Sequence, residues 1–283
     1  MASFTNFATL SYNGSTTNSN IVTGEILEAL TAVKTAVSAN YSAGDRITYA
    51  LSLVNTGTAA ITDYTVTDNL GGYTVGANTV YPLAYNAGTV RYYINGVLQA
   101  SPTVTAGPPL TVTGLTVPAG GSAVLIYETT ATPVAPLATG SSITNTATIT
   151  GGGLTTPITA QATVETANSA ELSISKALSP TTVTENGQIT YTFVISNTGN
   201  TEATATGNVV VTDTFAPILR NIAVTYNGTA WTEGTNYTYN AATGVFTTLA
   251  GQITVPAASF TQNTDGTFTV TPGTATLVIT GTV

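Results

Sequence analysis

The chain has 283 residues, enough for two domains of ordinary size that each bury a core. Only 6% of the residues are charged, and 13 acidic against 5 basic residues give a net charge of −8, which argues against nucleic-acid binding because phosphate contacts need clustered Lys and Arg. Cysteine and histidine are absent, which excludes disulfides, thiolate metal sites and the commonest general base.

No targeting or membrane segment is visible in the sequence. Met1 is followed by polar residues rather than by a basic and then an apolar run, so no signal peptide is recognised. No stretch is long and apolar enough to span a bilayer, and we expect no membrane insertion. Phosphate-binding loops, nucleophile elbows and carboxylate pairs do not stand out. We therefore predict a protein that is not an enzyme and has no metal and no cofactor.

The first segment, residues 1–25, has the alternating pattern of a strand pair. Its run Ser3-Phe4-Thr5-Asn6-Phe7-Ala8-Thr9-Leu10 matches residues 142–149, which close the first of two repeats. Phe4, Asn6, Ala8 and Leu10 share one face, because alternate residues of a strand point the same way. We predict that residues 1–25 form a donor-strand hairpin. A flexible tail beside a merely shortened second domain is the alternative.

Two repeats follow, over residues 26–166 and 167–283. The run from Ile47 to Gly57 recurs 142 residues later, from Ile189 to Gly199. Stretches rich in Thr and Val between Gly, Pro and Asn turns favour short strands. The sequence predicts an all-β fold of two tandem immunoglobulin-like β-sandwiches with an N-terminal donor-strand extension. Since no segment like 142–149 follows the second repeat, we expect that sandwich to be incomplete.

The recurring motifs are a Lys strand, Thr-Tyr followed by Asn-Thr-Gly, Val-Thr-Asp, and Asn-x-Ala-Thr. As a set they resemble the immunoglobulin-like repeat called domain of unknown function 11, which recurs in large bacterial and archaeal cell-surface proteins. The resemblance covers nearly the whole chain from Leu30 onward and implies an extracellular structural role without a defined activity. The size and two-repeat layout also resemble the small structural proteins of clostridial spore appendages, which implies a place on the cell or spore surface.

The displaced closing hairpin points to head-to-tail assembly. A sandwich short of edge strands exposes unpaired backbone groups and a strip of core, and a strand from another molecule satisfies both. In a linear tandem, residues 1–25 lie a full domain away from the open end of the second repeat. Pairing with a neighbour then needs only stacking, and such a heterologous contact propagates as a filament. Closure within one chain is the alternative, and it predicts a monomer.

The chain contains only two lysines, Lys34 and Lys176, which occupy the same position of the repeat. Alternate-residue counting places each on a strand face with apolar neighbours, so both are predicted to point into the core. The same counting puts four further polar residues on core-facing positions: Asp68, Asp213, Asn145 and Asn6. Each completed domain would then bury one Lys, one Asp and one Asn, which is costly unless they pair or react.

This arrangement is similar to that of Gram-positive pilin and adhesin domains that form Lys–Asn isopeptide bonds on their own. Burial favours a neutral amine, which is a nucleophile, and a protonated carboxyl group, which can polarise the amide and shuttle protons as ammonia leaves. The similarity implies a bond between Lys34 and Asn145 assisted by Asp68. A second set would lie between subunits, with Lys176 joined to the neighbour's Asn6 and assisted by Asp213. The alternative in both places is a buried Lys–Asp ion pair beside a hydrogen-bonded Asn.

The remaining candidates are weaker. Scattered aromatic residues could line a sugar-binding face, although such residues in a sandwich more often belong to the core: Trp231, Tyr237, Tyr239, Tyr92, Tyr93 and Tyr226. Acids near turns lack the spacing of a calcium loop: Asp45, Asp63, Glu185 and Asp265. Our main hypothesis is a structural subunit whose partner is itself, polymerised head to tail into an extracellular or spore-surface filament. The alternative is a monomeric surface adhesin or carbohydrate-binding module.

Overall fold

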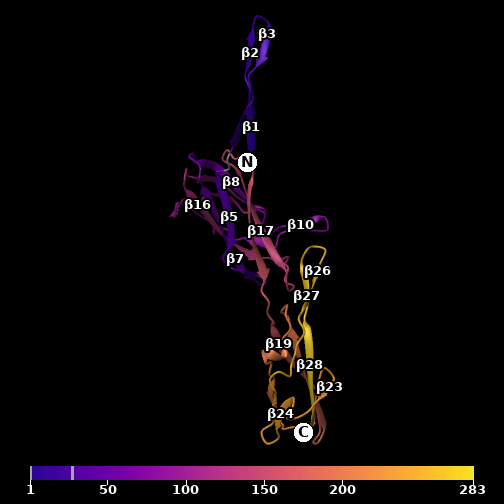
Figure 1. The fold of residues 1–283 in the computed structure, drawn as a ribbon. Helices are drawn as coiled ribbons and strands as arrows, with labels where there is room; N and C mark the ends of the chain where they lie inside the picture. Colours follow the sequence, from indigo (N-terminus) through magenta and orange to yellow (C-terminus); the bar gives the residue numbers. More distant parts are fainter. Residues whose placement is uncertain (1, 27–28) are drawn as a thin grey trace. The chain divides into compact units, whose positions relative to one another are not determined.

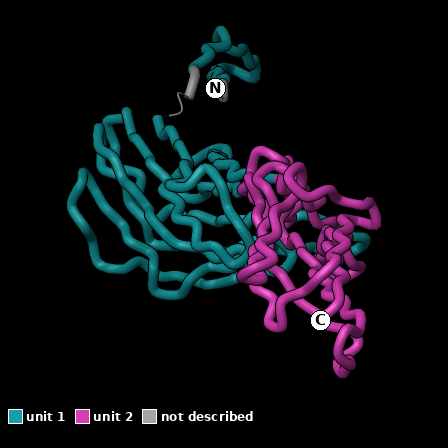
Figure 2. Tube along the Cα trace, turned by 90° about the horizontal axis from the view of Figure 1, so that it is seen from below, with its two compact units in different colours: residues 1–135, 142–165 teal, residues 136–141, 166–283 magenta. Residues whose placement is uncertain are grey.

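The computed structural model describes residues 2–26 and 29–283, and the regular secondary structure of these residues is β-strand apart from one short 3-10 helix (Figure 1). The predicted all-β class of immunoglobulin-like sandwiches is confirmed. The chain divides into two compact units (Figure 2), of which unit 1 comprises residues 1–135 and 142–165 and unit 2 comprises residues 136–141 and 166–283.

Residues 2–26 form a long hairpin of four short strands: β1 (Ala2–Asn6), β2 (Thr9–Tyr12), β3 (Ser15–Asn18) and β4 (Val22–Ile26). β2 pairs antiparallel with β3, and β1 with β4. The two-residue turn Asn13-Gly14 has positive φ at both positions, 46° and 80°, which is the conformation that Asn-Gly supplies in hairpins with two-residue loops. The described side chains of this hairpin lie almost entirely in solvent.

The first sheet of unit 1 has the strand order β13-β12-β16-β7-β5, with β11 also paired to β16. Its strands are β5 (Leu30–Ala36), β7 (Arg46–Asn55), β11 (Leu83–Tyr85), β12 (Arg91–Ile94), β13 (Val97–Leu98) and β16 (Ser122–Ala131). β16 alternates strictly between half-buried and buried residues, which is the period-2 pattern of a strand with one face on a core.

The second sheet of unit 1 has the order β14-β15-β8-β17-β18-β6. Its strands are β6 (Asn40–Tyr41), β8 (Ile61–Asp68), β14 (Thr103–Thr105), β15 (Leu110–Val117), β17 (Ser142–Gly151) and β18 (Ile158–Thr166), and a separate small hairpin joins β9 (Tyr73–Val75) to β10 (Asn78–Val80). β8 lies between β15 and β17, so both of its edges are hydrogen-bonded.

Unit 2 repeats the first sheet as β19-β20-β28-β22-β23, whereas the sheet that contains β21 has only the order β21-β25-β24 among the described residues. The strands are β19 (Leu172–Ser179), β20 (Gln188–Asn197), β21 (Thr212–Thr214), β22 (Arg220–Tyr226), β23 (Thr229–Trp231), β24 (Tyr237–Asn240), β25 (Val245–Thr248) and β28 (Gly273–Thr282), with a hairpin of β26 (Ser259–Gln262) and β27 (Phe268–Thr271) and a 3-10 helix η1 (Ala205–Gly207).

The pairings show which strands of the two units correspond. Lys34 of β5 lies opposite Leu51 of β7, and Lys176 of β19 lies opposite Phe193 of β20. β21 corresponds to β8, because Asp68 and Asp213 contact the two lysines in the same way. In the described part of unit 2, β21 pairs with β25 alone, and strands equivalent to β17 and β18 are absent. One side of β21 is therefore left without a strand.

The core of unit 2 gives a test of strand orientation. Phe246 on β25 is fully buried and packs against Tyr237 and Phe215, whereas its neighbour Val245 is 36% exposed. We expect Phe246→Ala to lower the free energy of unfolding by about 3–5 kcal/mol, because it removes a buried ring and leaves a cavity. Val245→Ala should cost less than about 1 kcal/mol. Chemical denaturation measures both, and equal losses would contradict the orientation of β25.

Candidate cross-linking site and open sheet edge

Unit 1 buries a Lys–Asp pair between its two sheets. Lys34 comes from β5 and Asp68 from the end of β8, and their side chains are 0% and 1% exposed. The Lys34 Nζ donates to Asp68 Oδ2 at 2.5 Å. The Tyr127 hydroxyl on β16 donates to the same oxygen, and the Leu70 backbone N–H donates to Oδ1. Both carboxyl oxygens of Asp68 therefore have donors, which is the condition for burying this group.

Asn145 on β17 completes the predicted set of three. β17 pairs with β8 so that Ala147 lies opposite Asp68, and Asn145 is two residues along on the same face. The Asn145 side chain is fully buried, and neither its Oδ1 nor its Nδ2 has a hydrogen-bond partner. The amide still interacts with the hydroxyls of Tyr49 and Tyr127. Tyr127 thus links Asp68 to Asn145, and the structure brings Lys34, Asp68 and Asn145 into one buried cluster.

The electrostatics of this cluster shift the Lys34 amine toward its uncharged form. Burial lowers the pKa of Lys34 from 10.5 to about 8, and the charge and hydrogen bond of Asp68 oppose that shift only in part. Burial also raises the pKa of Tyr49 and of Tyr127 well above the ordinary value, with Asp68 adding to the effect. Both phenols therefore remain protonated hydrogen-bond donors at neutral pH.

The equivalent pair in unit 2 has the same contact but lies open. Lys176 Nζ donates to Asp213 Oδ2 at 2.5 Å, and the two side chains are 40% and 17% exposed. The ammonium group lies over the rings of Tyr191, Phe193 and Phe215, at 4.5, 5.4 and 5.5 Å from their centroids. The Lys–Asp contact is the same in both units. The greater exposure of the pair in unit 2 is therefore due to the strands that cover the pair in unit 1 and have no equivalent over the pair in the described part of unit 2.

The exposed strip continues along β19. Its residues are exposed throughout, including the core-facing Leu172, Ile174 and Leu178. The corresponding strand of unit 1, β5, buries Leu30 and Lys34. Lys176 was predicted to point into the core. In a single chain it faces the apolar side of β19, but that side is open to solvent.

The hairpin 2–26 repeats the pairing of the hairpin β17–β18. Asn145 lies opposite Ala162, and Asn6 lies opposite Val22 at the matching position. Phe4, Asn6, Ala8 and Leu10 are all exposed, as are the apolar Phe7, Ile21 and Val22. Phe4 takes the place of Ile143, and its ring fills the space above Gly24, where any Cβ would lie 2.4 Å from it. A larger ring on one strand is thus matched by a glycine on the other.

Three tyrosines near the lysines were not identified from the sequence. Tyr49 and Tyr191 occupy the same repeat position, within Ile-Thr-Tyr runs that also repeat, and this identity was the available signal. The sequence gave no such signal for Tyr127, because its contact with Asp68 joins strands that are far apart in the sequence. Its position in unit 2 is held by Ile279, since Tyr127 lies opposite Tyr49 and Ile279 lies opposite Tyr191.

The remaining sequence candidates have structural partners. Tyr226 stacks on Trp231 and hydrogen-bonds to the Thr254 carbonyl, and Tyr239 donates to the Leu219 carbonyl. Tyr92 and Tyr237 are buried, and Tyr93 is half-buried. Asp45 and Asp265 accept bonds from their own turns. Over residues 2–26 and 29–283, no group of three potential metal ligands gathers, and no helix has the length and hydropathy to cross a membrane.

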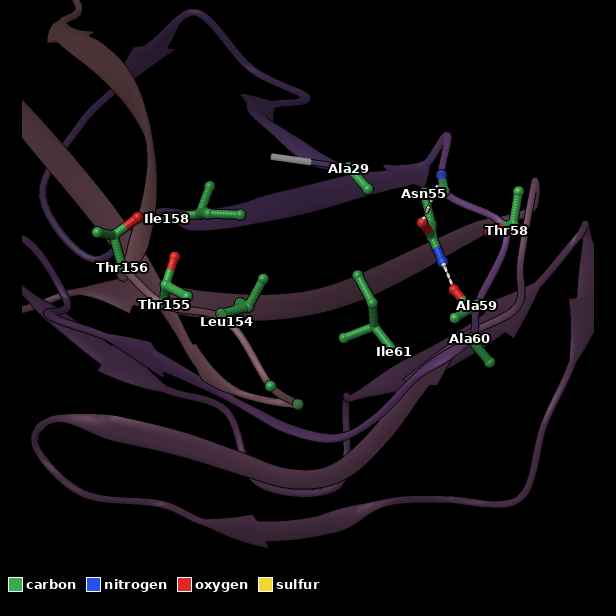
Figure 3. A pocket seen from close by; sticks show the side chains of 13 residues that line it. Ala29, Asn55, Thr58, Ala59, Ala60, Ile61, Leu154, Thr155, Thr156 and Ile158 are labelled. Atoms are coloured by element: carbon green, nitrogen blue, oxygen red, sulfur yellow. Dashed lines mark hydrogen bonds between the residues drawn. The ribbon is translucent and has the colours of Figure 1, made fainter. Parts of the chain in front are cut away.

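A pocket of about 350 Å³ in unit 1 lies where β7 leads into β8 and β17 leads into β18 (Figure 3). Its lining is backbone, Thr, Ala, Ile and Leu, with Asn55 as the one amide side chain. The Asn55 amide donates to the Ala59 carbonyl and accepts from the Gly57 N–H. Among the described residues that line this pocket, none has a titratable side chain.

Comparison with known proteins gives distant structural neighbours. No protein-family model matches the chain, and no curated protein matches it significantly. Among solved structures, the pilus backbone protein RrgB of Streptococcus pneumoniae is 14% identical, with a TM-score of 0.36, over 86% of this chain and 55% of that chain. The major pilin subunit BcpA of Bacillus cereus is 13% identical, with a TM-score of 0.35, over 96% and 73%. This chain thus spans about half the length of RrgB.

A third neighbour is the collagen-binding subdomain of the Enterococcus faecalis surface protein ACE, at 10% identity and a TM-score of 0.30, over 49% of this chain and 99% of that chain. The immunoglobulin-like all-β fold is read from the strands themselves. The resemblance to domain of unknown function 11 and to spore appendages stays a prediction.

The lowered pKa of Lys34 predicts that stability depends on pH. The effect is best measured in the Asn145→Ala variant, which cannot form the Lys34–Asn145 isopeptide bond predicted from the sequence. Between pH 8 and 10.5 the unfolded chain keeps a proton that folded Lys34 has released. The unfolded state therefore binds more protons, and the free energy of unfolding should rise with pH across this window. Denaturation at several pH values measures it. The same variant with Lys34→Met should lack this component, and identical pH profiles would contradict the shift.

Proposed function

We propose that the protein is a structural subunit that polymerises head to tail into an extracellular filament by donor-strand complementation. One comparison carries the proposal: unit 1 covers its Lys–Asp pair with the hairpin β17–β18, unit 2 leaves the same pair and β21 uncovered, and residues 2–26 form a hairpin with the same partner pairing as β17–β18. Docking of residues 2–26 from a neighbour supplies what unit 2 lacks.

The energetics favour this docking. β21 offers backbone N–H and C=O groups that pair with an added strand, which is the basis of β-strand addition. The exposed apolar side chains of β19 (Leu172, Ile174 and Leu178) and of the hairpin (Phe4 and Leu10) leave water in the same step. A donor on one end of the molecule and an acceptor elsewhere make a heterologous contact, which propagates from subunit to subunit.

We further propose that each completed cluster forms a Lys–Asn isopeptide bond. The unpartnered amide of Asn145 is the main support, because a buried amide without hydrogen bonds costs about 1–3 kcal/mol for each unsatisfied group. The alternative of an ion pair beside a hydrogen-bonded Asn is supported only by the contacts of the Asn145 amide with the Tyr49 and Tyr127 hydroxyls. Lys34 would attack Cγ of Asn145, and Lys176 would attack Cγ of the neighbour's Asn6. One ammonia leaves for each bond formed.

The other possibilities have less support. The aromatic side chains that could form a sugar-binding platform are buried or hydrogen-bonded to their own unit, so an adhesin or carbohydrate-binding module is favoured by no contact described above. A place on the cell or spore surface agrees with the filament role.

Boiled, full-length protein on a denaturing gel tests the covalent polymer. We expect a ladder of multimers whose intact masses lack one ammonia for every bond. Lys176→Met should abolish the ladder while filaments persist under the electron microscope, because strand pairing does not need the amine. A ladder that survives this substitution would show that the intersubunit bond is assigned to the wrong lysine.

Asn145→Ala is the matched variant for unit 1. The ladder should remain, with each subunit heavier by about one ammonia after allowance for the substitution. Chains that carry both Lys176→Met and Asn145→Ala should show no ammonia loss at all. A monomer that has lost two ammonias, without multimers, would point instead to closure within one chain and would sink the filament proposal.

A further inference from the structure

The cluster of unit 1 contains a phenol for which the proposed cross-link has so far no use. The Tyr49 hydroxyl on β7 is buried and lies beside the Asn145 amide, and neither group has a well-formed hydrogen bond. The Tyr49 ring stacks on Tyr127 at 5.8 Å between centroids and has Lys34 Nζ 4.8 Å from its centre. A phenol and an amide thus lie together next to the nucleophile.

Attack of the amine on the Asn145 amide requires a hydrogen-bond donor at the amide oxygen, which Asp68 does not supply. When Lys34 Nζ bonds to Cγ of Asn145, negative charge develops on Oδ1, and a preorganised donor there lowers the barrier. Asp68 Oδ2 is bonded to Lys34 and Tyr127, and Oδ1 is bonded to the Leu70 N–H. Its task is to take a proton from the amine and pass it to the leaving nitrogen. The Tyr49 O–H lies beside the Asn145 amide and can donate to the oxyanion when the amide oxygen faces it.

We propose that Tyr49 and Tyr191 are catalytic residues of cross-link formation, each donating a hydrogen bond from its phenol to the asparagine Oδ1 as the tetrahedral intermediate forms. The inference rests on the proposed isopeptide chemistry and adds a role to it. In unit 1 the acceptor is Asn145, and in unit 2 it is Asn6 of the neighbour.

The repeat separates this role from that of the second phenol. Tyr49 recurs as Tyr191, whose ring has Lys176 Nζ 4.5 Å from its centre. Tyr127 is replaced by Ile279. A group needed by both reactions must be present at both sites, and only the Tyr49 position meets this condition. Tyr127 is then a positioning residue that holds Asp68 in unit 1 alone.

The reaction balances without any external reagent. The Lys Nζ lone pair forms the new N–C bond while the C=O electron pair moves onto Oδ1, which receives the phenol hydrogen bond. One amine proton passes through the Asp carboxyl group to the amide nitrogen. The oxyanion then re-forms the C=O bond, the C–Nδ2 bond breaks, and ammonia departs. The phenol keeps its proton throughout, in line with the raised pKa of Tyr49.

A two-chain reaction isolates the site in unit 2. The acceptor chain carries Asn6→Ala, which disables its own donor, and the donor chain carries Lys176→Met, which disables its own acceptor. Mixed while unfolded and transferred together to native buffer, the pair can form one intermolecular product, a covalent dimer. Each chain loses one ammonia through its own bond in unit 1, and the dimer lacks one further ammonia for the bond between the chains. Its appearance is followed on a denaturing gel and by intact mass, and light scattering follows non-covalent assembly.

Adding Tyr191→Phe to the acceptor should slow dimer formation on the order of 10²-fold, because removal of one oxyanion donor costs about that much. Non-covalent assembly should be unchanged, since the ring remains. Tyr237→Phe in the acceptor removes a phenol from another buried tyrosine, which packs on Phe246, and should leave the rate unaltered.

An unchanged rate with Tyr191→Phe, when the parent pair forms dimer, would overturn the catalytic role and leave the isopeptide proposal standing. An equal slowing by Tyr237→Phe, or a parallel loss of non-covalent assembly, would also overturn it, by showing a structural effect. If the parent pair assembles but never becomes covalent, the isopeptide chemistry itself fails and the role of Tyr191 fails with it.

Discussion

The structure depends on a Lys–Asp pair that must be covered by further strands to be buried. A lysine and an aspartate on facing sheets can be buried only if hydrogen bonds satisfy both and the surrounding strands exclude water evenly. In unit 1, β17 and its partner β18 cover the pair, and Lys34 and Asp68 are buried beneath these strands. In unit 2, Lys176 and Asp213 make the same 2.5 Å contact without covering strands. The two units therefore show one site in two states of coverage.

This difference is the reason that, in our proposal, one element serves both assembly and cross-linking. The strand that covers the pair also carries the asparagine, so coverage and arrival of the electrophile are a single event. In the proposed reaction, water leaves the amine when the amide reaches it. In unit 1, burial lowers the pKa of Lys34 and so shifts it toward its neutral form.

The hairpin 2–26 carries an unusual surface for a segment in solvent. Several of its exposed side chains are large and apolar, and its edges expose backbone groups, a combination that natural sheets otherwise avoid. A hairpin of this kind is marginal alone and gains stability when it joins a larger sheet. Its replacement of Ile143 by Phe4, with Gly24 opposite, keeps the cross-strand volume of the hairpin that closes unit 1.

The sequence alone determined the all-β class, the repeat, and the inward faces of Lys34, Asp68 and Asn145, because alternation along a strand is a local property with period two. It also indicated the likeness between residues 3–10 and 142–149, which depends on side-chain order alone. Only the tertiary structure decided which groups meet: the bond of Tyr127 to Asp68, the unpartnered amide beside Tyr49, and the exposure of Lys176. These facts depend on strand order and on which strands are missing from a sheet, and such long-range pairings are not encoded in local periodicity.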